Sequence, residues 1–180
     1  MHIYIVNGAP GSGKTTFETL VRQKIGSDWV FILSTIDPIK QAAKFLGWTG
    51  VKDPKARKFL SDLKDLANSV YDTSYRYIAN EINKIDKSFS VYDMPTDDVV
   101  VFIDSREPWD IQRLSLMYNA KTILIKRASG ADDAEILNHA DRDVELFEYD
   151  IYIENDGDLD WLSEKVDDFI EDEGIKRPSR

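Results

Sequence analysis

The sequence contains no cysteine, so it can form no disulfide bond, carries no thiol nucleophile and offers no thiolate ligand for zinc. It also has no apolar stretch long enough to cross a membrane. An apolar run, Ile3-Tyr4-Ile5-Val6, follows Met1 almost directly, and the basic-then-apolar pattern of a secretory signal peptide is missing. We therefore expect a cytoplasmic protein that has no membrane partner.

The sequence also has fewer basic than acidic residues, 23 against 33. The formal net charge is -10 at pH 7, and no basic stripe is apparent. Most of the excess acidity lies between Glu154 and Glu173, which hold ten acidic residues and one lysine. This concentration predicts the solvated face of a last helix. Without a basic stripe, we expect no nucleic-acid partner.

The pattern that the chain does have is an alternation of strands and helices. Its 180 residues suffice for one domain with a substantial core. Apolar runs predict strands near residues 2–6, 29–33, 99–104, 122–125 and 151–153. Helical spacing predicts helices near 14–25, 38–46 with Asp37 as cap, 54–87 with a break at 72–74, 108–118 and 159–169, while 88–98 looks irregular. This order predicts an α/β fold with three α/β/α layers around a five-stranded parallel sheet.

A complete phosphate-loop motif lies between the first predicted strand and helix. It consists of Gly8, Ala9, Pro10, Gly11, Ser12, Gly13, Lys14 and Thr15. The glycines allow tight turns and close approach to phosphate oxygens, and the helix start adds backbone amides and a positive dipole. Lys14 would reach the β- and γ-phosphates, the Thr15 hydroxyl would ligate Mg²⁺, and Thr16 joins the nucleotide-binding set. The alternative, a glycine-rich turn before an ordinary helix, explains the flanking pattern less well.

Polar side chains follow the predicted strands, where open parallel sheets bind their ligands. They are Ser34, Asp37 and Lys40 after the second strand, Asp104 and Arg106 after the third, and Asn155 and Gly157 after the last.

Several of these residues also have an ordinary structural interpretation. Asp104 fits support of Mg²⁺, and it also fits capping of the next helix. Arg106 favours bidentate binding of a phosphate, and the alternative is a surface ion pair with Glu107 or Asp110. Asp37 is explained by helix capping alone, although a substrate or metal role also fits. Lys40 fits either a phosphate contact or a solvated lysine.

These motifs together resemble a known group. The phosphate loop, the Asp37-Pro38-Ile39-Lys40 run, the Asp104-Ser105-Arg106 turn and the Asn155-Asp156-Gly157 turn recur in this order in the nucleoside-monophosphate-kinase-like P-loop kinases. The chain is most similar to phage-type deoxynucleoside monophosphate kinases and animal-type phosphomevalonate kinases. The resemblance spans nearly the whole chain, and its most specific part is the phosphate loop.

The resemblance implies roles for individual residues. ATP and Mg²⁺ would bind at the phosphate loop, and Asn155 would contact the adenine edge above Gly157, although a structural turn explains this pair equally well. A helical insertion at residues 57–86 would bind a small phosphorylated acceptor. The acceptor-site residues would be Ser34, Asp37, Lys40, Arg57, Arg76 and Arg106. Cations and tyrosines within the insertion suit a nucleotide, but the aromatic rings also suit a helical core.

The resemblance further implies a lid at residues 127–149. Its only arginines are Arg127 and Arg142, fewer than in many relatives. A lid arginine would neutralise charge on the phosphoryl group in transfer, and we assign Arg142 to catalysis with Lys14, Asp104 and Arg106. His139 is expected to be a surface helix residue.

The expected reaction is in-line transfer of the ATP γ-phosphoryl group to an acceptor phosphate, preferably that of a nucleoside or deoxynucleoside monophosphate. Phosphomevalonate and dephospho-coenzyme A are alternative acceptors. A kinase acting on a hydroxyl would need Asp37 or Asp104 as general base. A nucleotide-binding switch without an acceptor is the third alternative, and the insertion and the lid argue against it.

Overall fold

The computed structural model describes residues 1–127 and 147–176. Within them the strands are β1 His2–Asn7, β2 Val30–Ser34, β3 Val100–Asp104, β4 Lys121–Lys126 and β5 Ile151–Glu154. The helices are α1 Lys14–Ile25, α2 Asp37–Phe45, α3 Pro54–Tyr71, α4 Thr73–Val91, α5 Pro108–Tyr118 and α7 Leu159–Asp172. Each predicted strand and helix within these residues is present, with small differences at its ends.

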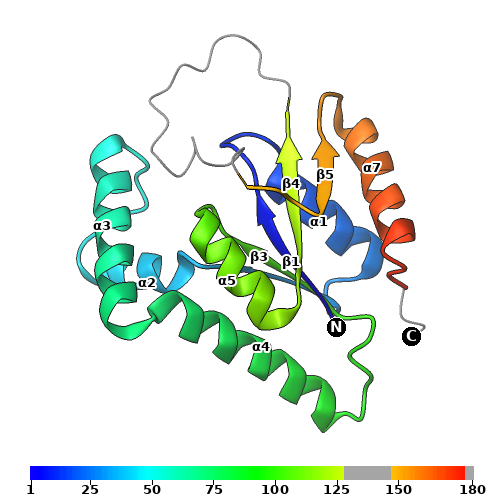
Figure 1. The fold of residues 1–180 in the computed structure, drawn as a ribbon, viewed down its shortest axis with the longest axis horizontal. Coiled ribbons are helices and arrows are strands. Elements are labelled where there is room, and N and C mark those ends of the chain that lie inside the picture. The colour runs from blue at the N-terminus through cyan, green and yellow to red at the C-terminus, as the bar shows by residue number, and fades with distance from the viewer. Residues whose placement is uncertain (128–146, 177–180) are drawn as a thin grey trace. The chain divides into compact units, whose positions relative to one another are not determined.

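The strands form a five-stranded parallel sheet in the order β2-β3-β1-β4-β5 (Figure 1). In the register of the central strands, Val6 of β1 lies opposite Asp104 of β3 and Ile123 of β4. Because parallel strands point the same way, the residues that follow β1, β3 and β4 gather at one edge of the sheet. The predicted α/β fold class is therefore confirmed.

The chain forms two compact units, Met1–Ile32 with Pro95–Arg180, and Leu33–Met94. In the first unit, α1 and α7 contact each other and cover one face of the sheet (Figure 1). Their apolar side chains pack against alternate residues of β1, β3 and β4, among them Tyr4, Phe102 and Ile125. The residues between these, such as Ile103 and Leu124, are fully buried on the opposite face, where α5 contacts β1 and β4. The result is the predicted arrangement of three α/β/α layers.

The second unit contains α2, α3 and α4, which contact one another. The predicted break between the long helices is confirmed, because Asp72 takes a left-handed conformation with φ of 50° between α3 and α4. The predicted irregular segment from residue 88 is wrong at its start, since α4 continues to Val91. Phe89 extends the buried stripe of Ile82 and Ile85, and its burial stabilises the extra turn.

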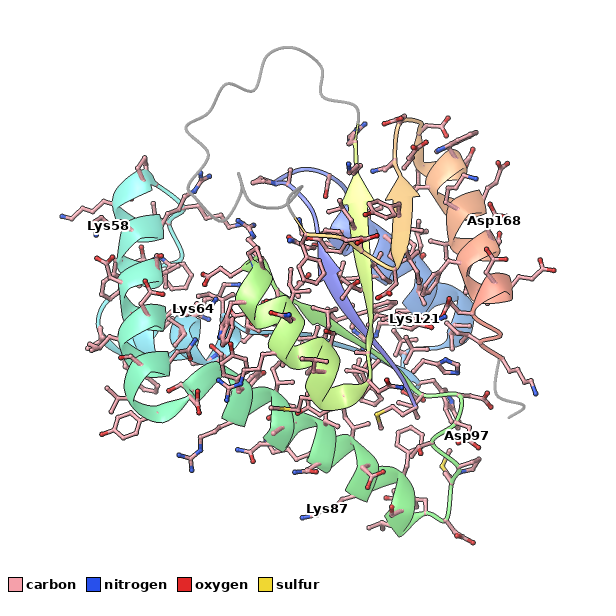
Figure 2. The ribbon with its side chains drawn as sticks, in the orientation of Figure 1. Lys58, Lys64, Lys87, Asp97, Lys121 and Asp168 are labelled. Atoms are coloured by element: carbon pink, nitrogen blue, oxygen red, sulfur yellow. The ribbon has the colours of Figure 1, made fainter. Side chains whose placement is uncertain are left out.

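The last helix and its surroundings explain the acidic C-terminal segment. Leu162, Val166 and Phe169 are buried, whereas the side chains of Asp167 and Asp168 are 62% and 63% exposed. This confirms the prediction of a solvated acidic face. Beyond α7, Glu173 accepts hydrogen bonds from the Tyr4 hydroxyl at 2.9 Å and from the ammonium of Lys121, labelled in Figure 2, at 2.8 Å, which ties the end of α7 to the sheet.

No helix among the described residues is long and apolar enough to cross a membrane.

Candidate phosphate-binding site

The phosphate loop connects β1 directly to α1 in the described structure. Gly8, Gly11 and Gly13 have φ values of 153°, 79° and 99°, which non-glycine residues rarely adopt. A Cβ on Gly8 would overlap the carbonyl oxygen of Ile125 in β4. A Cβ on Gly13 would overlap the side-chain amide of Asn155. Gly8 and Gly13 are thus required both by backbone conformation and by close packing. The sequence motif and the local geometry agree.

Lys14 begins α1 and its side chain folds back over the loop. Its ammonium donates to the carbonyl oxygens of Gly8 at 2.5 Å and Ala9 at 3.0 Å. Gly13 is the N-cap residue of α1 in a left-handed conformation, and the first backbone amides of an α-helix have no partner within the helix itself. Thr15 and Thr16 are exposed at this helix start. The site therefore combines a cation with the backbone amides of a helix start, which is the composition of an anion-binding site.

A pair of carboxyl groups interacts electrostatically with this lysine. Glu18, one turn after Lys14 on α1, is 1% exposed and hydrogen-bonds the side chain of Asp104 at the end of β3. Burial raises the pKa of Glu18 to about 9, and the charge of Asp104 acts in the same direction, whereas Lys14 opposes it. Among the described residues, Oε1 of Glu18 has no hydrogen-bond partner.

The sequence analysis missed Glu18. The signal was present, because Glu18 falls on the stripe that continues through Val21 and Ile25, where an acidic residue is out of place. The alternative interpretation of Asp104 was that it caps the next helix. Helix α5 has Glu107 as its N-cap residue, so Asp104 does not cap it.

Asn7 links three segments at the edge of the sheet. Its fully buried side chain accepts from the amide of Gly8 at 2.7 Å and donates to the carbonyl oxygen of Arg106 at 3.2 Å. It also donates to the hydroxyl of Tyr149 at 2.7 Å. The backbone of Arg106 is thereby fixed beside the start of the phosphate loop, while its side chain is exposed.

Asn155 lies beneath the other end of the loop. Its side-chain amide donates to the carbonyl oxygen of Ser12 at 2.9 Å, and its backbone amide donates to Lys126 at 2.7 Å. The side chain is thus engaged by the loop, and the expected contact with adenine stays a prediction. Gly157 follows at a tight position, because a Cβ there would lie 2.5 Å from the Cβ of Trp161.

The predicted acceptor residues of the second unit have separate surroundings. Asp37 does not cap its helix, which corrects the sequence prediction: Ile36 is the N-cap residue and Asp37 is the first helical residue. Its carboxylate lies 3.8 Å from the ammonium of Lys40, one turn later. Ser34 ends β2 and is half-buried, while Arg57 and Arg76 are exposed in the first turns of α3 and α4.

The predicted lid falls mostly outside the described residues. Arg127 follows β4 and is exposed, whereas Arg142 and His139 lie in the segment 128–146 that the structure does not describe. Tyr149, at the end of the predicted lid range, is buried.

Residues 1–127 and 147–176 contain no cluster of three or more histidine, cysteine or acidic side chains that could hold a metal ion alone. Mg²⁺ in phosphate-transfer sites is usually bound by one or two protein oxygens together with substrate phosphates and waters. The exposed hydroxyl of Thr15 and the half-buried carboxylate of Asp104 provide oxygens of this kind. These residues fit magnesium bound together with a nucleotide.

Comparison with known proteins shows the fold. The chain is similar to the crystal structure of TT1252 from Thermus thermophilus, with a TM-score of 0.54, 16% identity and coverage of 95% of this chain and 97% of that one. It is also similar to a provisionally described kinase of Chloroflexus aurantiacus J-10-fl, with a TM-score of 0.51, 15% identity and coverage of 95% and 96%. A shikimate kinase from Aquifex aeolicus VF5 matches with a TM-score of 0.48, 13% identity and coverage of 97% and 99%.

No family model and no curated protein sequence matches the chain. The similarity in structure, at these identities, identifies a three-layer α/β/α P-loop domain and says nothing of the substrate.

Proposed function

We propose that the protein is an ATP-dependent phosphotransferase that moves the γ-phosphoryl group of ATP to the phosphate of a small molecule. The observation that carries the proposal is the complete phosphate loop, with its glycines at positive φ and Lys14 folded over the carbonyls of Gly8 and Ala9. When a nucleoside triphosphate binds, its phosphate oxygens would replace these two carbonyl oxygens as acceptors for the ammonium of Lys14. The loop amides and the start of α1 would bind the remaining phosphate oxygens.

The reaction needs no strong general base. An oxygen of the acceptor phosphate, already ionised, attacks the γ-phosphorus, and the bond from this phosphorus to the bridging oxygen breaks, so that ADP leaves. Lys14 and Arg106 would neutralise the charge that collects on the transferred group and on the leaving oxygen. Mg²⁺ held by Thr15 and Asp104 would supply further charge neutralisation and orient the phosphates.

We favour a nucleoside or deoxynucleoside monophosphate as the acceptor, in keeping with the resemblance to the monophosphate kinases. Ser34, Asp37, Lys40, Arg57 and Arg76 would then bind the acceptor, and Arg127 and Arg142 would act from the lid. The cations of the helical unit suit an acceptor phosphate. Lys40 pairs with Asp37, so the carboxylate competes with an acceptor phosphate for the ammonium of Lys40.

The proposal is tested by ADP release from Mg-ATP in the presence of nucleoside and deoxynucleoside monophosphates, phosphomevalonate and dephospho-coenzyme A. We expect one of them to stimulate ADP release in the wild-type protein, and Lys14→Ala to abolish the stimulation while the fold is retained. Lys24→Ala is the matched control, because Lys24 lies on the same helix but pairs with Asp167 at 2.7 Å. A folded Lys14→Ala protein with unchanged turnover would refute the mechanism.

A further inference from the structure

The side chain of Asn155 is held under the phosphate loop. It is 5% exposed, and it forms a hydrogen bond with the main-chain oxygen of Ser12 at 2.9 Å. Because a carbonyl oxygen can only accept, the group that faces Ser12 must be the amide nitrogen. The backbone amide of Asn155 is bound in turn to the carbonyl of Lys126 at the end of β4. The end of β4 thus holds the backbone of Asn155.

Gly13 provides a second, independent sign of this contact. A Cβ on Gly13 would overlap Nδ2 of Asn155, and it would also come within 3.8 Å of a Leu162 methyl carbon. The loop backbone therefore lies directly on the asparagine amide. Gly13 is also the residue that caps α1, with φ of 99°. Asn155 accordingly contacts the backbone of Ser12 and Gly13, which directly precede Lys14 and the first amides of α1.

We propose that Asn155 is a positioning residue that holds the Ser12–Gly13 segment in its phosphate-binding conformation, and that it serves recognition of the polyphosphate rather than of the base. This rests on the proposed function only in requiring that the loop binds a nucleoside triphosphate. The loop would be formed before the ligand arrives, which removes an ordering cost from binding. Loss of the amide would leave the buried carbonyl of Ser12 without this donor and the loop less fixed.

Two ligands separate a role at the phosphates from a role at the base. We would measure binding of Mg-ATP and of magnesium tripolyphosphate, which has no base, to the wild-type chain and to Asn155→Ala by titration calorimetry. We expect the variant to bind both ligands about tenfold more weakly, which corresponds to about 1.4 kcal/mol. If the variant loses affinity for ATP alone, Asn155 contacts the base and the proposal is wrong.

Two further proteins guard against a loss of stability as the cause. Asn155→Leu keeps most of the side-chain volume without the donor and is expected to behave like Asn155→Ala. Gln112→Ala truncates an exposed amide on α5 of the same unit and is expected to bind both ligands like the wild type. A lower unfolding temperature of both Asn155 variants with unchanged binding of both ligands would reduce Asn155 to a structural residue and overturn the proposal.

The result is independent of phosphoryl transfer. If both ligands bind in an Asn155-dependent way but no acceptor stimulates ADP release, the positioning role stands and the kinase proposal is the one that fails. If the wild-type chain binds neither ligand, both proposals fail.

Discussion

Replacement of the buried Glu18 by glutamine should stabilise the protein at neutral pH. In the folded chain the carboxyl is 1% exposed and hydrogen-bonds Asp104, and burial raises its pKa from 4.5 to about 9. At pH 7 the folded state therefore keeps a proton that the unfolded state has lost. Glutamine has nearly the same shape, carries no charge at any pH and can donate to Asp104 through its amide group.

The size of the effect follows from the two pKa values. A group whose pKa is raised on folding contributes its full stability below its unfolded pKa, and that stability is lost progressively as the pH rises toward the folded pKa. For Glu18 this window runs from 4.5 to about 9. At 1.36 kcal/mol for each pH unit, the loss amounts to roughly 3 kcal/mol at pH 7, and it is below about 1 kcal/mol at pH 5.

The measurement is the free energy of unfolding in urea at pH 5, 6, 7 and 8, without nucleotide or divalent cation. We expect the free energy of unfolding of Glu18→Gln to exceed that of the wild type by an amount that grows steadily with pH. The matched control is Glu164→Gln on α7, whose side chain is exposed, and which should not show a gain that grows with pH. A stability difference between Glu18→Gln and the wild type that is constant over this range, or that falls with rising pH, would refute the protonated state of Glu18.

Two further substitutions test the buried hydroxyl of Tyr149 and the tight position of Gly157. Tyr149→Phe removes the hydroxyl that accepts from Asn7 at 2.7 Å, and it should lower the free energy of unfolding by about 1 kcal/mol while Asn7 keeps its bond to Arg106, as chemical denaturation would show. An unchanged midpoint would mean that this bond contributes nothing. Gly157→Ala places a Cβ 2.5 Å from the Cβ and Cγ of Trp161, so that the indole must move; we expect a loss of roughly 1–3 kcal/mol and altered tryptophan fluorescence. An alanine variant as stable as the wild type would show that the turn relaxes freely.

The features that the sequence determined on its own are those written in short windows of residues. Strand β3 is an uninterrupted β-branched and aromatic run, helix α1 has its apolar residues at helical spacing, and the phosphate loop is encoded in eight adjacent residues. Local backbone preference and periodicity suffice for such elements. Parallel pairing of the strands then followed from the alternation of strands and helices.

Where local signals compete, the sequence was less decisive. Asp37 before Pro38 has the composition of a helix cap, yet the helix includes Asp37, and it has no side-chain cap bond. The end of α4 was misplaced because polar residues after Ser88 suggested a loop, while burial of Phe89 decided for helix. At the end of α4 the outcome depends on which neighbours bury Phe89, and a short window of sequence does not contain them.

Only the tertiary structure decided how the candidate site is supported. The bond from Asn155 to Ser12 and the bond from Asn7 to Tyr149 join residues more than a hundred positions apart, and Glu18 meets Asp104 only because α1 packs against the strand that Asp104 ends. In sequence, the side-chain amide of Asn155 fits a turn, a contact with a base or a support of the loop equally well. Which partner it reaches could not be read from the sequence, because hydrogen bonds and buried charges depend on distances that the fold creates.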